Sequence, residues 1–170
     1  RTLEEHGIPM ETQWMYHLAC YAGTLGLICF GPPTEKEETF VLTNEWIQNS
    51  ANLNIDEQLA ELARMYFRSH SPATIDDFAW WCGLGKTECR KGINLIEHEF
   101  EKTEYQGKMY YSFADNKSEG SSSIKFIGGF DEYFLGYKDR SIVADIEHYS
   151  RLFTSNGIFF PLILENGRVI

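Results

Sequence analysis

A run of polar side chains near the middle of the chain has the residue types that bind nucleic acid. The candidate contact residues are Lys86, Thr87, Arg90, Lys91 and Asn94. Apolar residues alternate with them at steps of four, three and four, at Cys89, Ile93, Ile96 and Phe100. This spacing predicts a helix that begins near Lys86 and buries one face. Cationic and amide side chains on the opposite face could contact phosphates and base edges if the first turns of the helix enter a major groove.

The residues on either side predict the frame that would hold this helix. Thr74 and Asp77 form a capping-box pair, so a helix is expected to start there and to reach Cys82. The turn Gly83-Leu84-Gly85 follows, and Gly83 lies four residues after the small Ala79, a spacing typical of a helix-turn-helix. After the second helix, runs at 103–105 and 109–113 are joined through Gln106-Gly107 and predict a β-hairpin. The stretch is interpreted as a winged helix.

The first helix of this module is predicted just upstream. Asn54 caps it, with Glu57 at the third position. Its expected buried face consists of Ile55, Leu59, Leu62, Ala63, Tyr66 and Phe67. A complete winged helix-turn-helix module is therefore predicted over residues 53–114.

Residues 1–52 predict the C-terminal part of another winged-helix module. A helical spacing of apolar residues ends at Gly26 and is made by Trp14, Leu18, Tyr21, Ala22 and Leu25. Two short strands, 27–30 and 39–43, are expected on either side of a charged loop that contains Pro32-Pro33. Helix, strand, charged tip and strand are the back half of such a module.

The last part of the chain predicts the start of a β-rich domain over residues 124–170. Residues 115–123 have the composition of a flexible linker. A strand is expected at 124–127, an extended segment at 130–140, and a hairpin about the turn Asn166-Gly167. Because the sequence has no initiator Met and its last hairpin breaks off, we expect a piece of a longer protein. The predicted fold class is α+β, with tandem winged helix-turn-helix modules followed by part of a β-rich domain.

Composition limits the classes of function. The chain has 170 residues, 43% of them hydrophobic, and a formal net charge of −10. Phosphate contacts supply most non-specific affinity for nucleic acid, so this acidity argues against strong autonomous binding. The excess of negative charge lies mostly at the N-terminal end. Residues 1–54 hold two basic and seven acidic side chains, whereas residues 84–112 hold five of each. Four cysteines without Cys-x-x-Cys spacing, and no secretory signal or membrane span, predict a cytoplasmic protein with no metal site and no cofactor.

Three other motifs suggest chemistry, and each has a simpler interpretation. Gly85-Lys86-Thr87 resembles the end of a phosphate loop, but position 80 is Trp where that loop needs Gly. The acids Asp131 and Glu132 would point to opposite faces of a strand. The segment 130–140 is therefore expected to tie the β-rich part to the helices through buried ion pairs and aromatic packing, so that Arg140→Ala should unfold it. Of Trp80-Trp81, one is expected in the core and the other against a neighbouring module.

Three ordered stretches carry a family resemblance. They are Pro-Ala-Thr-Ile-Asp-Asp-Phe-Ala-Trp-Trp-Cys-Gly-Leu at 72–84, Phe-Asp-Glu-Tyr-Phe-Leu-Gly-Tyr-Lys-Asp-Arg at 130–140 and Asn-Gly-Ile-Phe-Phe-Pro-Leu-Ile-Leu-Glu-Asn-Gly-Arg-Val at 156–169. The chain resembles the bacterial family of tandem winged-helix DNA-binding proteins whose characterised members are DNA glycosylases acting on bulky alkyl adducts and interstrand crosslinks. The resemblance implies three winged helices held by a C-terminal β-domain. It also implies a catalytic Gln-x-Gln or Gln-x-Asp pair in the first module, and this sequence contains no such pair.

We therefore predict that the chain is a DNA-binding winged-helix protein and, by the resemblance, a fragment of a DNA-repair protein similar to DNA glycosylases. Its expected partner is double-stranded DNA. No association with a membrane is expected. Taken alone, these residues are expected to be inactive in base excision. The alternative is a non-catalytic transcriptional regulator or scaffold that uses winged helices for protein contacts, which the acidic balance favours. A Gln pair and a basic channel in an upstream module would distinguish the two.

Overall fold

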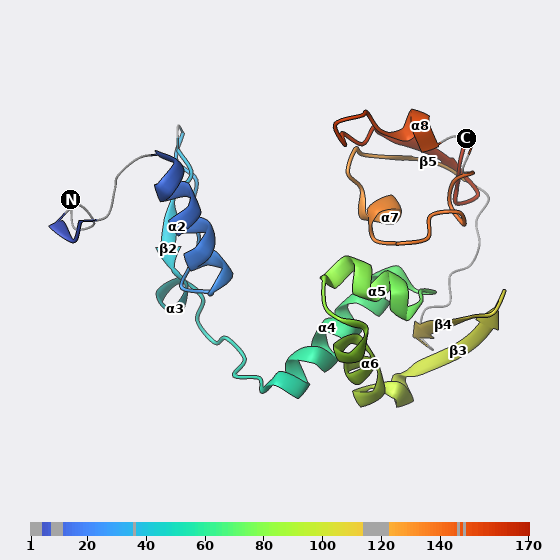
Figure 1. Cartoon of the computed structure of the whole chain (residues 1–170), viewed down its shortest axis with the longest axis horizontal. Coiled ribbons are helices and arrows are strands. Elements are labelled where there is room, and N and C mark those ends of the chain that lie inside the picture. Colours follow the sequence, from blue (N-terminus) through green and yellow to red (C-terminus); the bar gives the residue numbers. More distant parts are fainter. Residues whose placement is uncertain (1–4, 8–11, 36, 114–122, 146, 148) are drawn as a thin grey trace. The chain divides into compact units, whose positions relative to one another are not determined.

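The computed structural model describes residues 5–7, 12–35, 37–113, 123–145, 147 and 149–170. The chain divides into two compact units, Arg1–Asn52 and Leu53–Ile170. Figure 1 labels their helices and strands. Each unit is an assembly of helices and small antiparallel sheets, so the fold class is α+β.

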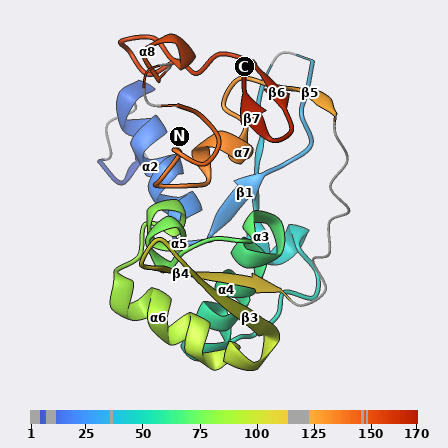
Figure 2. The ribbon, with the colours of Figure 1, turned by 90° about the vertical axis from the view of Figure 1, so that its right-hand side faces the viewer.

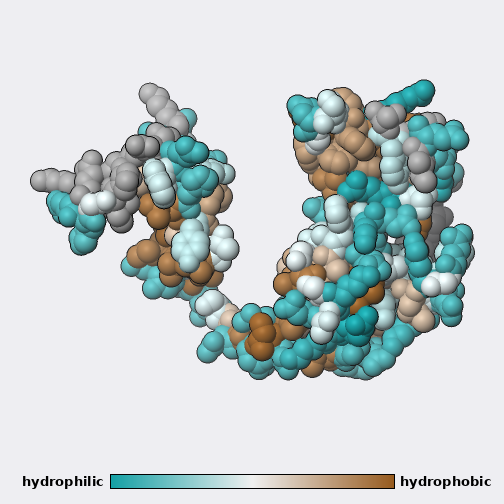
Figure 3. All heavy atoms as spheres, in the orientation of Figure 1, coloured by the Kyte–Doolittle hydropathy of each residue, from teal (hydrophilic) through white to brown (hydrophobic). Residues whose placement is uncertain are grey.

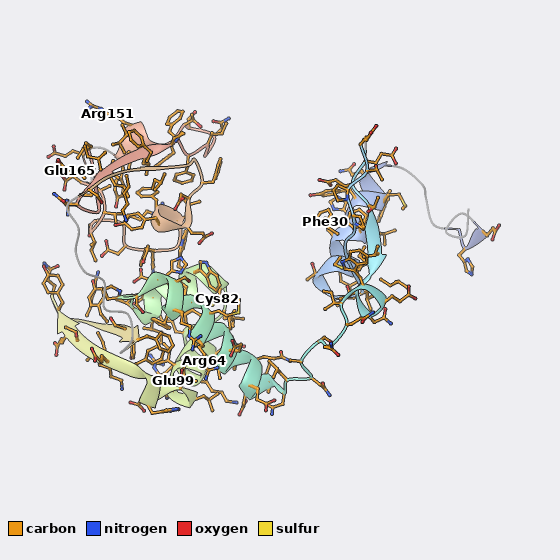
Figure 4. The ribbon with its side chains drawn as sticks, turned by 180° about the vertical axis from the view of Figure 1, so that it is seen from behind. Phe30, Arg64, Cys82, Glu99, Arg151 and Glu165 are labelled. Carbon is orange, nitrogen blue, oxygen red and sulfur yellow. The ribbon has the colours of Figure 1, made fainter. Side chains whose placement is uncertain are left out.

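The first unit pairs one helix with a two-stranded sheet. Its elements are α2 (Thr12–Thr24), β1 (Ile28–Phe30), β2 (Phe40–Leu42) and the short α3 (Thr43–Trp46). The strands pair antiparallel, with Cys29 opposite Val41. Phe30, labelled in Figure 4, stacks on Phe40 with ring centroids 5.1 Å apart. The helix and both strands expected here are confirmed.

The first unit keeps many apolar side chains at its surface. Figure 3 shows the strongly hydropathic ones in brown. The most exposed large hydrophobic side chains of the unit are Trp14, Tyr16, Tyr21, Leu25, Leu27 and Phe30. None of the described residues in this unit is fully buried. The hydrophobic core of the chain therefore lies in the second unit.

The second unit begins with three helices, α4 (Ile55–His70), α5 (Ile75–Cys82) and α6 (Lys86–Leu95). Both predicted capping boxes are present. The Asn54 side chain accepts hydrogen bonds from the N–H groups of Asp56 and Glu57, and the Thr74 hydroxyl accepts from the N–H of Asp77. These caps satisfy N–H groups that have no partner within the first turn of a helix, which fixes where each helix starts.

One core joins the three helices to the hairpin that follows them. Its fully buried members are Ala63, Tyr66, Phe67, Ala73, Phe78, Cys89, Ile93 and Ile96. Most of the residues predicted for the buried face of α4 pack in or against this core. Ile55 does not, since it lies in the first turn and is 64% exposed.

The third helix ends earlier than its apolar spacing predicts. α6 stops at Leu95, and a 3₁₀ turn, η1 (Glu97–Glu99), follows it. Phe100 is the first residue of β3 (Phe100–Tyr105), which pairs with β4 (Lys108–Phe113). The apolar spacing predicted a longer helix because Phe100 does pack on the same core. It reaches that core from a strand and not from a helix. Gln106 and Gly107 both have positive φ, 49° and 72°, as a two-residue hairpin turn requires.

Residues 123–170 build a three-stranded sheet with two short helices. The strands β5 (Ile124–Ile127), β6 (Leu162–Glu165) and β7 (Arg168–Val169) lie in the order β5-β6-β7, all antiparallel. The helices are α7 (Glu132–Leu135) and α8 (Tyr149–Leu152). The prediction of an extended segment at 130–140 is wrong, because this segment contains the helix α7. Asp131 caps that helix by accepting a hydrogen bond from the N–H of Tyr133 at 2.8 Å. Of the predicted linker at 115–123, all but Ser123 lies outside the described residues.

Buried hydrogen bonds connect this C-terminal part to the helices. The Tyr66 hydroxyl donates to the carbonyl of Gly136 at 2.9 Å. The buried carboxylate of Asp77 accepts from the N–H groups of Lys138 at 3.0 Å and Asp139 at 3.2 Å. α5 and the loop after α7 are thereby held together within one unit.

Candidate nucleic-acid interface

Local geometry places α6 at the edge of the three-helix group. Gly83 ends α5 in the left-handed region at φ 73°, which lets the chain reverse before Gly85. The Glu88 carboxylate accepts the N–H of Gly85 at 3.1 Å and closes the first turn of α6. Figure 2 shows α6 on the outside of this group, with the hairpin of β3 and β4 next to it.

The packing of α6 against α4 decides which face of α6 is free. Cys89, Gly92 and Ile93 are buried on the inner side. A Cβ atom at Gly92 would lie 2.6 Å from the carbonyl oxygen of Leu59, so only glycine allows the two helices this close. The opposite face points away from the core.

All five predicted contact residues are exposed on that outer face. They are Lys86, Thr87, Arg90, Lys91 and Asn94. Their position on one helix face follows from the helical period, as the sequence predicts. Whether they contact DNA stays a prediction.

Carboxylates neutralise two of the three cations on this face. Lys86 Nζ lies 2.5 Å from Asp76 Oδ1 on α5, and Lys91 Nζ lies 2.5 Å from Asp56 Oδ1 on α4. The hydrogen bond from Lys86 lowers the pKa of Asp76, which favours the charged form of this carboxylate. Arg90 forms no ion pair within the part of the chain that the structure describes. It is therefore the most available positive charge on α6.

Two further lysines lie near the start of α6 and were missed by sequence reasoning. Lys108 is the first residue of β4, and Lys138 lies in the loop after α7. Together with Lys86 they line a groove of about 660 Å³. Lys108 could have been found, because a cation directly after a hairpin turn lies at an exposed tip. No local pattern predicts that Lys138 joins it.

The tryptophan pair faces α7. Trp81 packs against the core, and its indole N–H donates to Glu132 Oε2 at 3.0 Å. Trp80 is 55% exposed, and its N–H donates to the carbonyl of Leu135 at 3.3 Å. One ring therefore packs on the core, and the other contacts α7 within the same unit.

The acids of the 130–140 segment have structural partners. Asp131 caps α7, and Glu132 lies 3.6 Å from His70 Nε2. Asp139 accepts hydrogen bonds from Lys108 and Ser141, and these, with Lys108 first, lower its pKa to about 2. Across the described ranges, no group of three His, Cys, Asp or Glu residues could hold a metal ion. No helix among the described residues is long and apolar enough to cross a lipid bilayer.

The fold and this face define an α+β protein with an exposed, partly neutralised cationic helix beside a hairpin. The chain belongs to the AlkZ-like DNA glycosylase family, whose model matches residues 1–170. It is 27% identical over 157 residues to an interstrand DNA cross-link repair glycosylase of Streptomyces sahachiroi, covering 85% of this chain and 42% of that protein. The solved structure of the DNA glycosylase AlkZ from the same organism matches with a TM-score of 0.74 and 25% identity, again over 85% and 42% of the two chains. The chain thus spans less than half the length of these relatives.

Proposed function

We propose that this chain is the DNA-binding portion of a DNA-repair glycosylase, in which residues 53–113 form a winged helix that contacts double-stranded DNA. The exposed face of α6, with Arg90 free of carboxylate partners among the described residues, carries this proposal. Helix α6 would be the recognition helix, and the hairpin of β3 and β4 would be the wing. Membership of the glycosylase family supplies the expectation of a DNA substrate.

The division of the chain follows from the same proposal. Residues 1–52 would be the C-terminal part of a second winged-helix module, and residues 124–170 the start of the C-terminal β-rich domain. The sequence lacks a Gln-x-Gln or Gln-x-Asp pair. We therefore infer that this chain binds and positions DNA, while residues outside it carry out base excision.

Substitution of Arg90 tests the proposal. Arg90→Ala in the intact protein removes one unpaired cation, and removing one phosphate contact is expected to make the slope of log affinity against log salt shallower by about one. The measurement is fluorescence anisotropy on a labelled duplex over a series of salt concentrations. Arg151→Ala is the matched control, because Arg151 is also exposed but lies on α8. An unchanged salt slope for Arg90→Ala would rule out this face of α6.

A further inference from the structure

The groove beside α6 brings together three lysines from separate segments. Lys86 comes from α6, Lys108 from the start of β4 and Lys138 from the loop after α7. Each side chain is more than half exposed, at 56%, 51% and 58%. The sequence assigns a role to Lys86 alone.

One carboxylate oxygen lies between two of these cations. Asp76 Oδ1 is 2.5 Å from Lys86 Nζ and 3.8 Å from Lys138 Nζ. This oxygen marks a point where a single anionic atom contacts both lysines at once. The third cation, Lys108, is held by Asp139 Oδ2 at 2.5 Å.

The acids of the groove differ in how easily they can be replaced. Asp77 is buried and accepts hydrogen bonds from the N–H and the hydroxyl of Thr74 and from the N–H groups of Lys138 and Asp139, so its carboxylate is committed to contacts within the fold. Asp76 is 43% exposed, and its ion pairs face solvent, which screens such pairs strongly. Another anion can therefore exchange with Asp76 at small cost.

We propose that this groove binds a backbone phosphate of DNA, which replaces Asp76 between Lys86 and Lys138. The inference rests on the proposed function and extends the DNA contact from α6 to the hairpin and the loop after α7. A nucleic-acid phosphate fits because it offers several anionic oxygens, and its binding releases counterions from the duplex. A metal ion does not fit, because no group of three His, Cys, Asp or Glu residues among those the structure describes could hold one. Asp76 acts as an internal competitor that lowers the affinity of the groove for DNA.

Asp76→Asn tests this competition directly. The amide keeps the shape of the side chain but frees Lys86 and Lys138, so the intact protein is expected to bind a duplex roughly threefold tighter or more at low salt, with a salt slope steeper by about one. Asp145→Asn is the matched control. It makes the same substitution and frees Arg168 from an exposed ion pair that lies outside both the groove and the proposed winged helix. Anisotropy titrations at several salt concentrations measure both variants.

Lys138→Ala tests the proposed phosphate contact by removing one of its two lysines. It should weaken binding and make the salt slope shallower by about one, because a phosphate partner is lost. Lys125→Ala, which removes an exposed lysine on β5, controls for net charge.

The inference is overturned if Asp76→Asn binds no tighter than Asp145→Asn, or if Lys138→Ala behaves like Lys125→Ala. In either case, a shallower salt slope for Arg90→Ala would still support the proposed function. Absence of duplex binding by the unsubstituted protein at the lowest salt would overturn the proposed function itself, and this inference with it.

Discussion

Arg140 shows how a single residue joins the C-terminal part to the helices. Its guanidinium lies over the rings of Phe134 at 4.9 Å, Phe159 at 5.6 Å and Trp80 at 5.9 Å. Burial lowers its pKa, and its Nε donates to the carbonyl of Tyr137 at 3.3 Å. Sequence reasoning expected a buried ion pair here. Within the described residues the partners are aromatic faces instead, which attract a cation through the ring quadrupole.

Arg140→Ala should lower the free energy of unfolding by about 2 kcal/mol, because it removes a partly desolvated cation and the packing of its stem. Urea denaturation followed by circular dichroism measures the change. Arg151→Ala, at an exposed site, should change stability by about 0.5 kcal/mol or less. Equal stability of the two variants would show that the aromatic cluster does not need its cation.

The seam between α4 and α6 is the feature that presents the candidate face. Along it, Gly92 approaches the backbone of Leu59, and Ala63 lies next to both, within the core. At the outer end of the seam, Arg64 of α4 donates two hydrogen bonds to Glu99, at 3.0 and 2.6 Å, and Figure 4 shows these two side chains meeting. Small residues inside the seam hold α6 close to α4, and the two-point ion pair ties η1, the turn after α6, to α4.

Gly92→Ala tests this seam. Alanine favours a helix by about 1 kcal/mol over glycine, yet its Cβ would lie 2.6 Å from a carbonyl oxygen, so α6 must move outward. Overpacking of this kind costs about 1 to 3 kcal/mol, and we expect a net loss of about 1 kcal/mol in the free energy of unfolding. A thermal melt with circular dichroism measures it. A more stable variant would mean that helix propensity outweighs the close contact.

Under the proposed function, this chain is one part of a larger activity. It spans 42% of the glycosylase to which it is similar, and its sequence lacks the glutamine pair that the family resemblance associates with excision. Its described residues offer exposed cations, but no cluster that could hold a metal ion. The proposed role is therefore to bind and orient the duplex.

A base-excision assay on a crosslinked duplex checks this division of labour. The intact protein is expected to excise the crosslinked base, whereas the 170-residue chain alone should give no product above background. The chain alone should still bind the duplex at low salt, which shows that it is folded. Excision by the chain alone would place the chemistry within these residues.

Local signals in the sequence are enough to predict several elements of this fold. Asn54 and Thr74 start helices, Gly83 reverses the chain, and Gln106-Gly107 turns the hairpin, each through contacts within about four residues. The helical period then placed the five candidate residues on one face. The same local reasoning failed at Phe100 and at Asp131, where tertiary packing and a side-chain cap decided between helix and strand.

Which charges form ion pairs depends on contacts between segments that are distant in the sequence. The pair of Lys91 and Asp56 joins residues 35 positions apart, and Lys108 and Asp139 are 31 apart. No period or motif encodes such pairs, because they depend on how α4, α6 and the loop after α7 dock on one core. That docking makes Arg90 the available cation on α6 and assembles the groove around Asp76. Helical periodicity therefore predicts α6 and its polar face, while the packing of distant segments decides which charges on that face remain free to bind.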